Sequence, residues 1–136
     1  MNTLKPRIPA FLPWAGAALF GAAVGLGGWW LTVWARLHCL ADQDAGGNLE
    51  LNVLLLLVPG MGVLAALAAL RIGRLLTRSA PTAVRRVTPV LLIAVMTVLP
   101  VWWVFADRGT LDGYPSHSDA CPSSNIPPQW PDWIPA

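Results

Sequence analysis

Three long apolar stretches without a single charged residue constrain this chain more than any other feature. They cover residues 13–35, 51–70 and 88–106. About 20 apolar residues in an α-helix cross a hydrocarbon layer about 30 Å thick. The chain is 55% hydrophobic and 12% charged, whereas a soluble domain has about 25% charged residues. We therefore predict an all-α integral membrane protein with three transmembrane helices.

The charged residues are segregated between the segments that flank these stretches. Residues 1–12 and 71–87 hold seven of the nine basic residues and no acid, whereas residues 36–50 and 107–136 hold all seven acids. Because basic segments stay on the cytoplasmic side, we predict a multi-pass plasma-membrane protein. Its N-terminus (1–12) and basic loop (71–87) are expected to be cytoplasmic, and its loop (36–50) and C-terminal tail (107–136) extracytoplasmic.

The basic loop contains five arginines, which we expect to anchor the topology and to contact anionic lipids at the inner face. They are Arg71, Arg74, Arg78, Arg85 and Arg86. A basic residue near an anionic surface contributes about 1 kcal/mol. Nucleic acid is not an expected partner, since no folded reading surface accompanies these residues.

The first apolar stretch carries small residues along one helical face. They are Ala17, Gly21, Gly25 and Gly28, spaced by three or four residues. Glycine costs a helix about 1 kcal/mol relative to alanine, but in a bilayer the G-x-x-x-G pattern lets a second helix approach closely. We predict that this face packs against a neighbouring helix. The pattern leaves open whether that neighbour belongs to the same chain.

Tryptophan, proline and glycine mark further features of the spans. Proline within the second stretch, at Pro59-Gly60, predicts a kink, more readily a static bend than a hinge. The second helix is expected to continue through Thr77, and the third to start at Thr88-Pro89, with proline in the first turn.

Indole rings favour the membrane interface, and six tryptophans near span ends are assigned to it: Trp14, Trp29, Trp30, Trp34, Trp102 and Trp103.

The tail has six prolines and is expected to be largely irregular and extended. Three apolar residues near its end, Trp130, Trp133 and Ile134, could return to the membrane, pack on the outer loop or dock on a partner.

Cys39 and Cys121 both fall on the oxidising outer side and lie within reach of each other. We predict that they form a disulfide bond.

A metal site is the competing interpretation of the same region. Imidazole, thiolate and carboxylate groups suit zinc or copper, and the candidates are His38, Cys39, His117, Asp119 and Cys121. Their spacing matches no established zinc pattern, and a disulfide would consume both thiolates. We therefore predict neither a bound metal nor a cofactor.

The spans contain none of the groups that chemistry or coupled transport requires. No Asp, Glu, Lys, Arg or His lies within them, whereas proton relays and pumps use intramembrane ionisable residues. The chain also shows no nucleophile–base pair or phosphate loop. We predict a protein that is not an enzyme and serves as an accessory or assembly subunit beside other membrane helices. The alternatives are an extracytoplasmic ligand or metal sensor or protective protein, and a homo-oligomeric channel or transporter.

Overall fold

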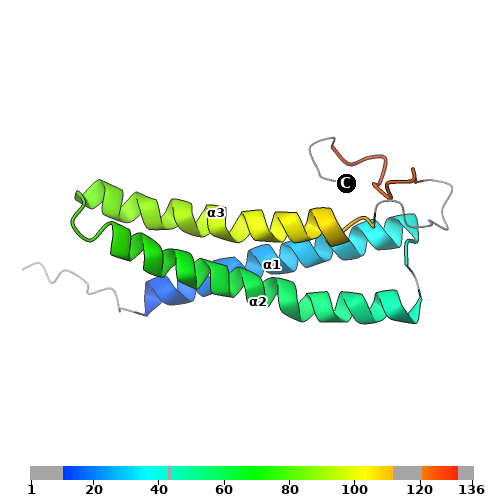
Figure 1. Cartoon of the computed structure of the whole chain (residues 1–136), viewed down its shortest axis with the longest axis horizontal. Coiled ribbons are helices and arrows are strands. Elements are labelled where there is room, and N and C mark those ends of the chain that lie inside the picture. Colours follow the sequence, from blue (N-terminus) through cyan, green and yellow to red (C-terminus); the bar gives the residue numbers. More distant parts are fainter. Residues whose placement is uncertain (1–10, 43, 112–120, 132–136) are drawn as a thin grey trace, which may run out of the picture.

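Three long helices dominate the fold. The computed structural model describes residues 11–42, 44–111 and 121–131. The helices are α1 (Leu12–Cys39), α2 (Ala45–Leu76) and α3 (Thr82–Arg108), and the described residues contain no β-strand. The helices run side by side, in alternating directions, as an elongated bundle (Figure 1). All three are long and apolar enough to cross a membrane. The prediction of three long apolar helices is thereby confirmed for the described residues, and such helices are typical of a multi-pass membrane protein.

Each helix is longer than the apolar stretch that predicted it. With 28, 32 and 27 residues and a rise of 1.5 Å per residue, the helices measure about 40–48 Å. They are therefore longer than the hydrocarbon thickness of about 30 Å.

The start of α3 differs from the prediction. The helix begins at Thr82 rather than Thr88, because the backbone N–H of Arg85 already donates to the Pro81 carbonyl at 3.0 Å. Pro89 consequently lies inside α3, and its assignment to the first turn was wrong. It packs against Gly73 of α2, where an added Cβ would lie 2.7 Å from the Pro89 Cα.

The connection between α1 and α2 is closed by defined local contacts. Leu40 ends α1 in the left-handed region with a φ of 50°. Asp44 caps α2, since its side chain accepts a hydrogen bond from the Gly47 N–H at 2.9 Å. An aspartate in this position satisfies a helix N–H that has no partner within the helix. At the other end of α2, the Thr77 hydroxyl donates to the Gly73 carbonyl at 2.7 Å.

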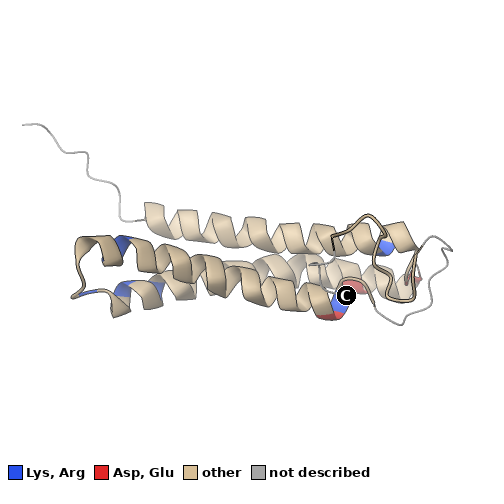
Figure 2. Ribbon diagram, turned by 90° about the horizontal axis from the view of Figure 1, so that it is seen from above, with Lys and Arg blue, Asp and Glu red and all other residues tan. Residues whose placement is uncertain are grey.

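The second helix, α2, is the central element of the bundle. It packs extensively against both α1 and α3, which contact each other less. The two ends of the bundle differ in charge, as Figure 2 shows. We call the end with the α2–α3 connection the basic end and the end with the α1–α2 connection the cap end. The described acids all lie at the cap end.

Candidate functional site

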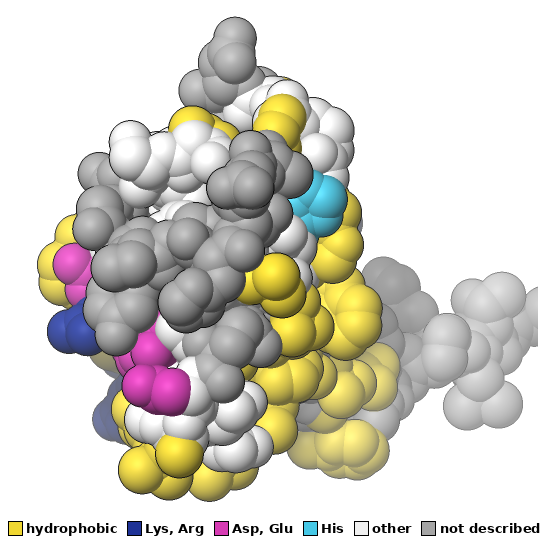
Figure 3. Space-filling model, turned by 90° about the vertical axis from the view of Figure 1, so that its right-hand side faces the viewer, with side chains coloured by type: hydrophobic (Ala, Val, Ile, Leu, Met, Phe, Trp, Pro, Cys, Tyr) yellow, Lys and Arg dark blue, Asp and Glu magenta, His cyan; other side chains and the backbone are white. Residues whose placement is uncertain are grey.

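The cap end is covered by a tail segment that a disulfide attaches to α1. Cys39, the last residue of α1, is bonded to Cys121 across 82 residues of sequence, with a Cα–Cα distance of 5.6 Å. Cys39 is fully buried. The predicted disulfide is therefore present. Figure 3 looks onto this end, where charged side chains lie beside apolar helix faces.

The competing metal site loses its sulfur ligands in this arrangement. Both thiols are consumed by the disulfide, and two of the remaining candidates, His117 and Asp119, lie outside the described residues. His38 lies against Trp34, with ring centroids 5.9 Å apart. Among the residues that the structure describes, no three metal-ligating side chains come together.

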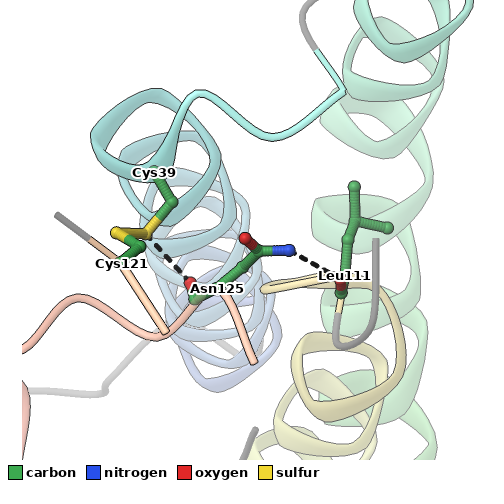
Figure 4. The surroundings of a disulfide bond; sticks show 4 residues. All are labelled: Cys39, Leu111, Cys121 and Asn125. Carbon is green, nitrogen blue, oxygen red and sulfur yellow. Dashed lines mark hydrogen bonds between the residues drawn. A yellow bond between two sulfur atoms is a disulfide. The ribbon is translucent and has the colours of Figure 1, made fainter. Parts of the chain in front are cut away.

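Asn125 secures the turn that follows Cys121. It is fully buried, and its φ of 55° is in the left-handed region, which asparagine tolerates better than most residues. Its side-chain Nδ2 donates to the Leu111 carbonyl at 2.8 Å, while its own carbonyl oxygen lies 3.2 Å from Cys39 Sγ (Figure 4). A disulfide sulfur has no proton to donate, so the second contact is a close S···O approach. Asn125 thus joins the tail to both the end of α3 and the disulfide.

Trp130 packs the far side of the tail onto the bundle. Its ring stacks on Trp34 of α1 at 5.1 Å between centroids and lies 5.8 Å from Phe105 of α3. Ala35 and Ile126 complete this apolar cluster. The sequence left three placements open for the apolar tail residues: the membrane, the outer loop and a partner. Trp130 adopts none of these and packs on the ends of α1 and α3 instead. Trp133 and Ile134 lie outside the described residues.

A buried arginine links all three helices beneath this cap. The Arg36 side chain is fully buried. Its Nη2 donates to the Arg108 carbonyl at 2.6 Å, and its Nη1 lies 3.3 Å from Glu50 and 3.7 Å from Asp42. Arg108 is itself 3.7 Å from the second Glu50 oxygen. A buried guanidinium needs such partners, because an isolated charge cannot stay desolvated.

In the sequence, Arg36 is one of the two basic residues that lie outside the basic segments. The available signal was its position as the single base in residues 36–50, beside Asp42, Asp44 and Glu50. Those residues gave no indication that the arginine would be buried. Asn125 was missed as well, and no motif in the tail pointed to it.

The glycine face of α1 lies against the other helices of the same chain. A Cβ added at Gly21 would overlap the Gly62 carbonyl of α2, and one added at Gly25 would lie 2.7 Å from the Val58 oxygen. At Gly28 the added atom would overlap a Val101 methyl of α3. Ala17 packs with Ala66 and Leu70 of α2. The face is thus occupied internally and by itself supports no external partner.

Pro59 and Gly60 occupy opposite environments on α2. Pro59 lies inside the helix and faces α1, where a Cβ on Gly25 would be 2.8 Å from the Pro59 nitrogen. Gly60 is exposed, and a Cβ added there would meet nothing within 4 Å. The predicted kink remains a prediction.

The assigned tryptophans have different surroundings. Trp30 and Trp103 are well exposed, at 62% and 71% of their surface. Trp29 donates from Nε1 to the Leu51 carbonyl at 2.9 Å and so ties α1 to α2. Trp102 is half-buried. Trp14, near the start of α1, lies beneath the guanidinium of Arg74.

No protein-family model, curated protein or solved structure matches this chain.

Proposed function

We propose that this protein is a small accessory subunit that packs against a transmembrane helix of a partner membrane protein. The proposal rests on the lipid-facing surface of α2, because the glycine face of α1 is already filled by the chain's own helices. No ionisable side chain lies in the three apolar stretches, so the bundle carries packing surfaces where a pump would carry charged groups.

One observation supports a helix-docking role more than any other. The exposed face of α2 has a shallow apolar groove of about 570 Å³, and Gly60, where an added Cβ would meet open space, is one of its lining residues. The groove is lined by Leu56, Leu57, Gly60, Met61, Leu64, Ala65 and Ala68. Small residues flanked by leucines let a partner helix approach closely in lipid, where packing drives association.

The cap end supports the same role. Its disulfide, the buried Arg36 and the Trp130 cluster hold the three helix ends together. A bundle stapled in this way presents α2 as a preformed surface, which lowers the entropic cost of binding a partner. With the cysteines joined to each other, a metal-sensing role has less support than a packing role.

The test is gentle detergent extraction followed by crosslinking and mass spectrometry of the wild type and two leucine variants. In Gly60→Leu the new side chain fills the groove, while in Gly27→Leu it extends into open space on α1, since neither glycine has a neighbour within 4 Å. Both changes replace glycine by a better helix former, so the two variants are matched. We expect Gly60→Leu alone to lose the partner.

Three results would count against the proposal. A wild-type protein that is strictly monomeric without a co-purifying protein would remove its basis. Equal retention of the partner by both variants would place the contact elsewhere. Recovery of a second copy of this chain alone would favour the homo-oligomeric alternative, which flux measurements on reconstituted liposomes would then examine.

A further inference from the structure

The arginines at the basic end have no acidic counterpart among the residues that the structure describes. The ion pairs within the described ranges involve Arg36 and Arg108, both at the cap end. Every acid of the chain lies in residues 36–50 or 107–136, and the basic end is formed by other segments (Figure 2). Several arginines that share one surface repel one another unless an anion lies between them.

Two adjoining hollows lie among these arginines. The first, of about 320 Å³, is lined by Trp14, Arg71, Arg74, Leu75 and Arg78. The second, of about 460 Å³, is lined by Arg74, Arg78 and Arg85. Arg74 and Arg78 therefore line both hollows and can direct their N–H donors into either.

Arg74 is held in place by an aromatic ring. Its guanidinium carbon lies 5.3 Å from the centroid of Trp14, which is the geometry of a cation–π contact. A guanidinium stacked in this way keeps its edge N–H groups free for bidentate binding of a phosphate or carboxylate. Trp14 thus joins α1 to a binding surface that otherwise belongs to α2, α3 and the connection between them.

An apolar crevice lies next to these hollows, between α1 and α3. It has a volume of about 240 Å³ and is lined by Gly16, Ala17, Phe20, Val90, Ile93 and Ala94. Ala17 packs with Leu70, and Ile93 packs against the same cluster. Trp14 lines the first hollow and Ala17 lines the crevice, and these two residues are three positions apart on α1, a rise of about 4.5 Å along the helix axis.

We propose that the basic end binds one anionic phospholipid of the bilayer. Its phosphate lies between Arg74 and Arg78, and one acyl chain enters the crevice between α1 and α3. A charged surface followed by an apolar crevice matches the two parts of such a lipid. A soluble anion would use the arginines alone, and the crevice therefore distinguishes a lipid from free phosphate. The inference does not depend on the proposed accessory role.

The head-group contact is tested by native mass spectrometry of the full chain in detergent, titrated with phosphatidylglycerol or phosphatidylcholine. We expect saturable binding of one phosphatidylglycerol and little binding of phosphatidylcholine. Arg74→Ala is expected to weaken binding about fivefold, since one basic residue near the membrane surface contributes about that factor. Arg86→Ala removes the same charge from the same end but lines neither hollow, and it is expected to bind like the wild type.

The acyl-chain contact is tested by filling the crevice. Gly16 lines it and has no neighbour within 4 Å of an added Cβ, so Gly16→Leu can occupy it without disturbing the bundle. Gly27→Leu on the same helix is the matched control. We expect Gly16→Leu alone to lose phosphatidylglycerol. An intact Cys39–Cys121 bond on a non-reducing gel and an unchanged helical spectrum check that each variant is folded.

Several outcomes would overturn the assignment. Equal losses in Arg74→Ala and Arg86→Ala would indicate general attraction to the basic end without a site. Full binding by Gly16→Leu would remove the acyl chain from the crevice. Competition by inorganic phosphate against the lipid, together with full binding by Gly16→Leu, would assign the arginines to a soluble anion.

Discussion

Substitution of Gly21 by alanine should destabilise the bundle, because its missing side chain is what allows α1 and α2 to touch. An added Cβ would overlap the Gly62 carbonyl oxygen and lie 2.6 Å from the carbonyl carbon and 2.8 Å from the Val63 nitrogen. Ordinary contact begins at 3.4 Å. Relief of the carbonyl-carbon contact alone would require a local separation of about 0.8 Å between the two helices, and the overlapping oxygen, which lies closer, requires more. All three obstructing atoms belong to the backbone, so no rotamer change can relieve the overlap.

The expected magnitude follows from two opposing effects. Overpacking a well-filled interior costs about 1–3 kcal/mol, and a clash with helix backbone belongs at the upper end of that range. Replacing glycine by alanine within a helix stabilises it by about 1 kcal/mol. We therefore expect Gly21→Ala to lower the unfolding free energy by about 2 kcal/mol.

The assay is unfolding of the oxidised protein in mixed micelles by a rising fraction of denaturing detergent, followed by tryptophan fluorescence. Gly16→Ala and Gly27→Ala are the controls, since an added Cβ there meets nothing within 4 Å. Both controls are expected to be unchanged or slightly more stable than the wild type. If Gly21→Ala unfolds at the same detergent fraction as these controls, the close approach of α1 and α2 does not exist and the reasoning fails.

The cap end provides the remaining predictions. Arg36→Met should destabilise the bundle by about 3 kcal/mol, because it removes the fully buried member of an ion-pair network and leaves two partly buried acids without their counter-charge. Arg108→Met, whose side chain is 58% exposed, should cost less than 1 kcal/mol. Both are measured by the same unfolding assay, and equal losses would contradict the burial of Arg36. Replacing Cys39 and Cys121 together by alanine should free the tail, so that limited proteolysis removes it while the three helices persist. If the tail resists the protease as well as in the wild type, the disulfide is not needed to hold it. Trp130→Ala should make the tail more sensitive to the same protease while the disulfide stays intact, since the stacked aromatic cluster contributes about 2–3 kcal/mol. Unchanged sensitivity would contradict the docking of Trp130 on the helix ends.

The cap holds the helix ends in two layers, one formed by the helices themselves and one by the tail. Arg36, Glu50 and the Arg108 carbonyl come from three different helices, so the cap depends on the relative position of all of them. The disulfide and the Trp130 cluster then cover the same end from the tail side. Movement of one helix along its axis would disturb both layers at once. The structure is consistent with a bundle that serves as a rigid unit.

The three spans could be predicted because their signal is local. Apolar stretches of about 20 residues specify membrane helices by length and hydropathy alone, and three such helices form. The helix ends were less predictable. Residues 82–88 contain both arginines and apolar residues, and the backbone closes its first turn at Pro81 regardless of hydropathy. The position of Pro89 within α3 follows from that turn.

The disulfide could also be predicted, because the chain has two cysteines and both fall beyond the spans on the same side. Small residues on one face of α1 likewise indicated close helix packing from their spacing alone. The sequence by itself therefore determined the helices, the face of α1 made of small residues and the cysteine pair. Each depends on spacing along one helix or on residue type.

Only the tertiary structure decided what those features contact. Gly21 and Gly25 contact α2 of the same chain. The spacing of small residues along α1 does not specify which helix packs against them. Arg36 is buried because three helix ends converge around it, and Trp130 docks because the disulfide brings its segment there. These contacts join residues up to 96 positions apart, as for Trp34 and Trp130. Neither residue type nor local spacing encodes such distant pairs, since they form only when the whole bundle has closed.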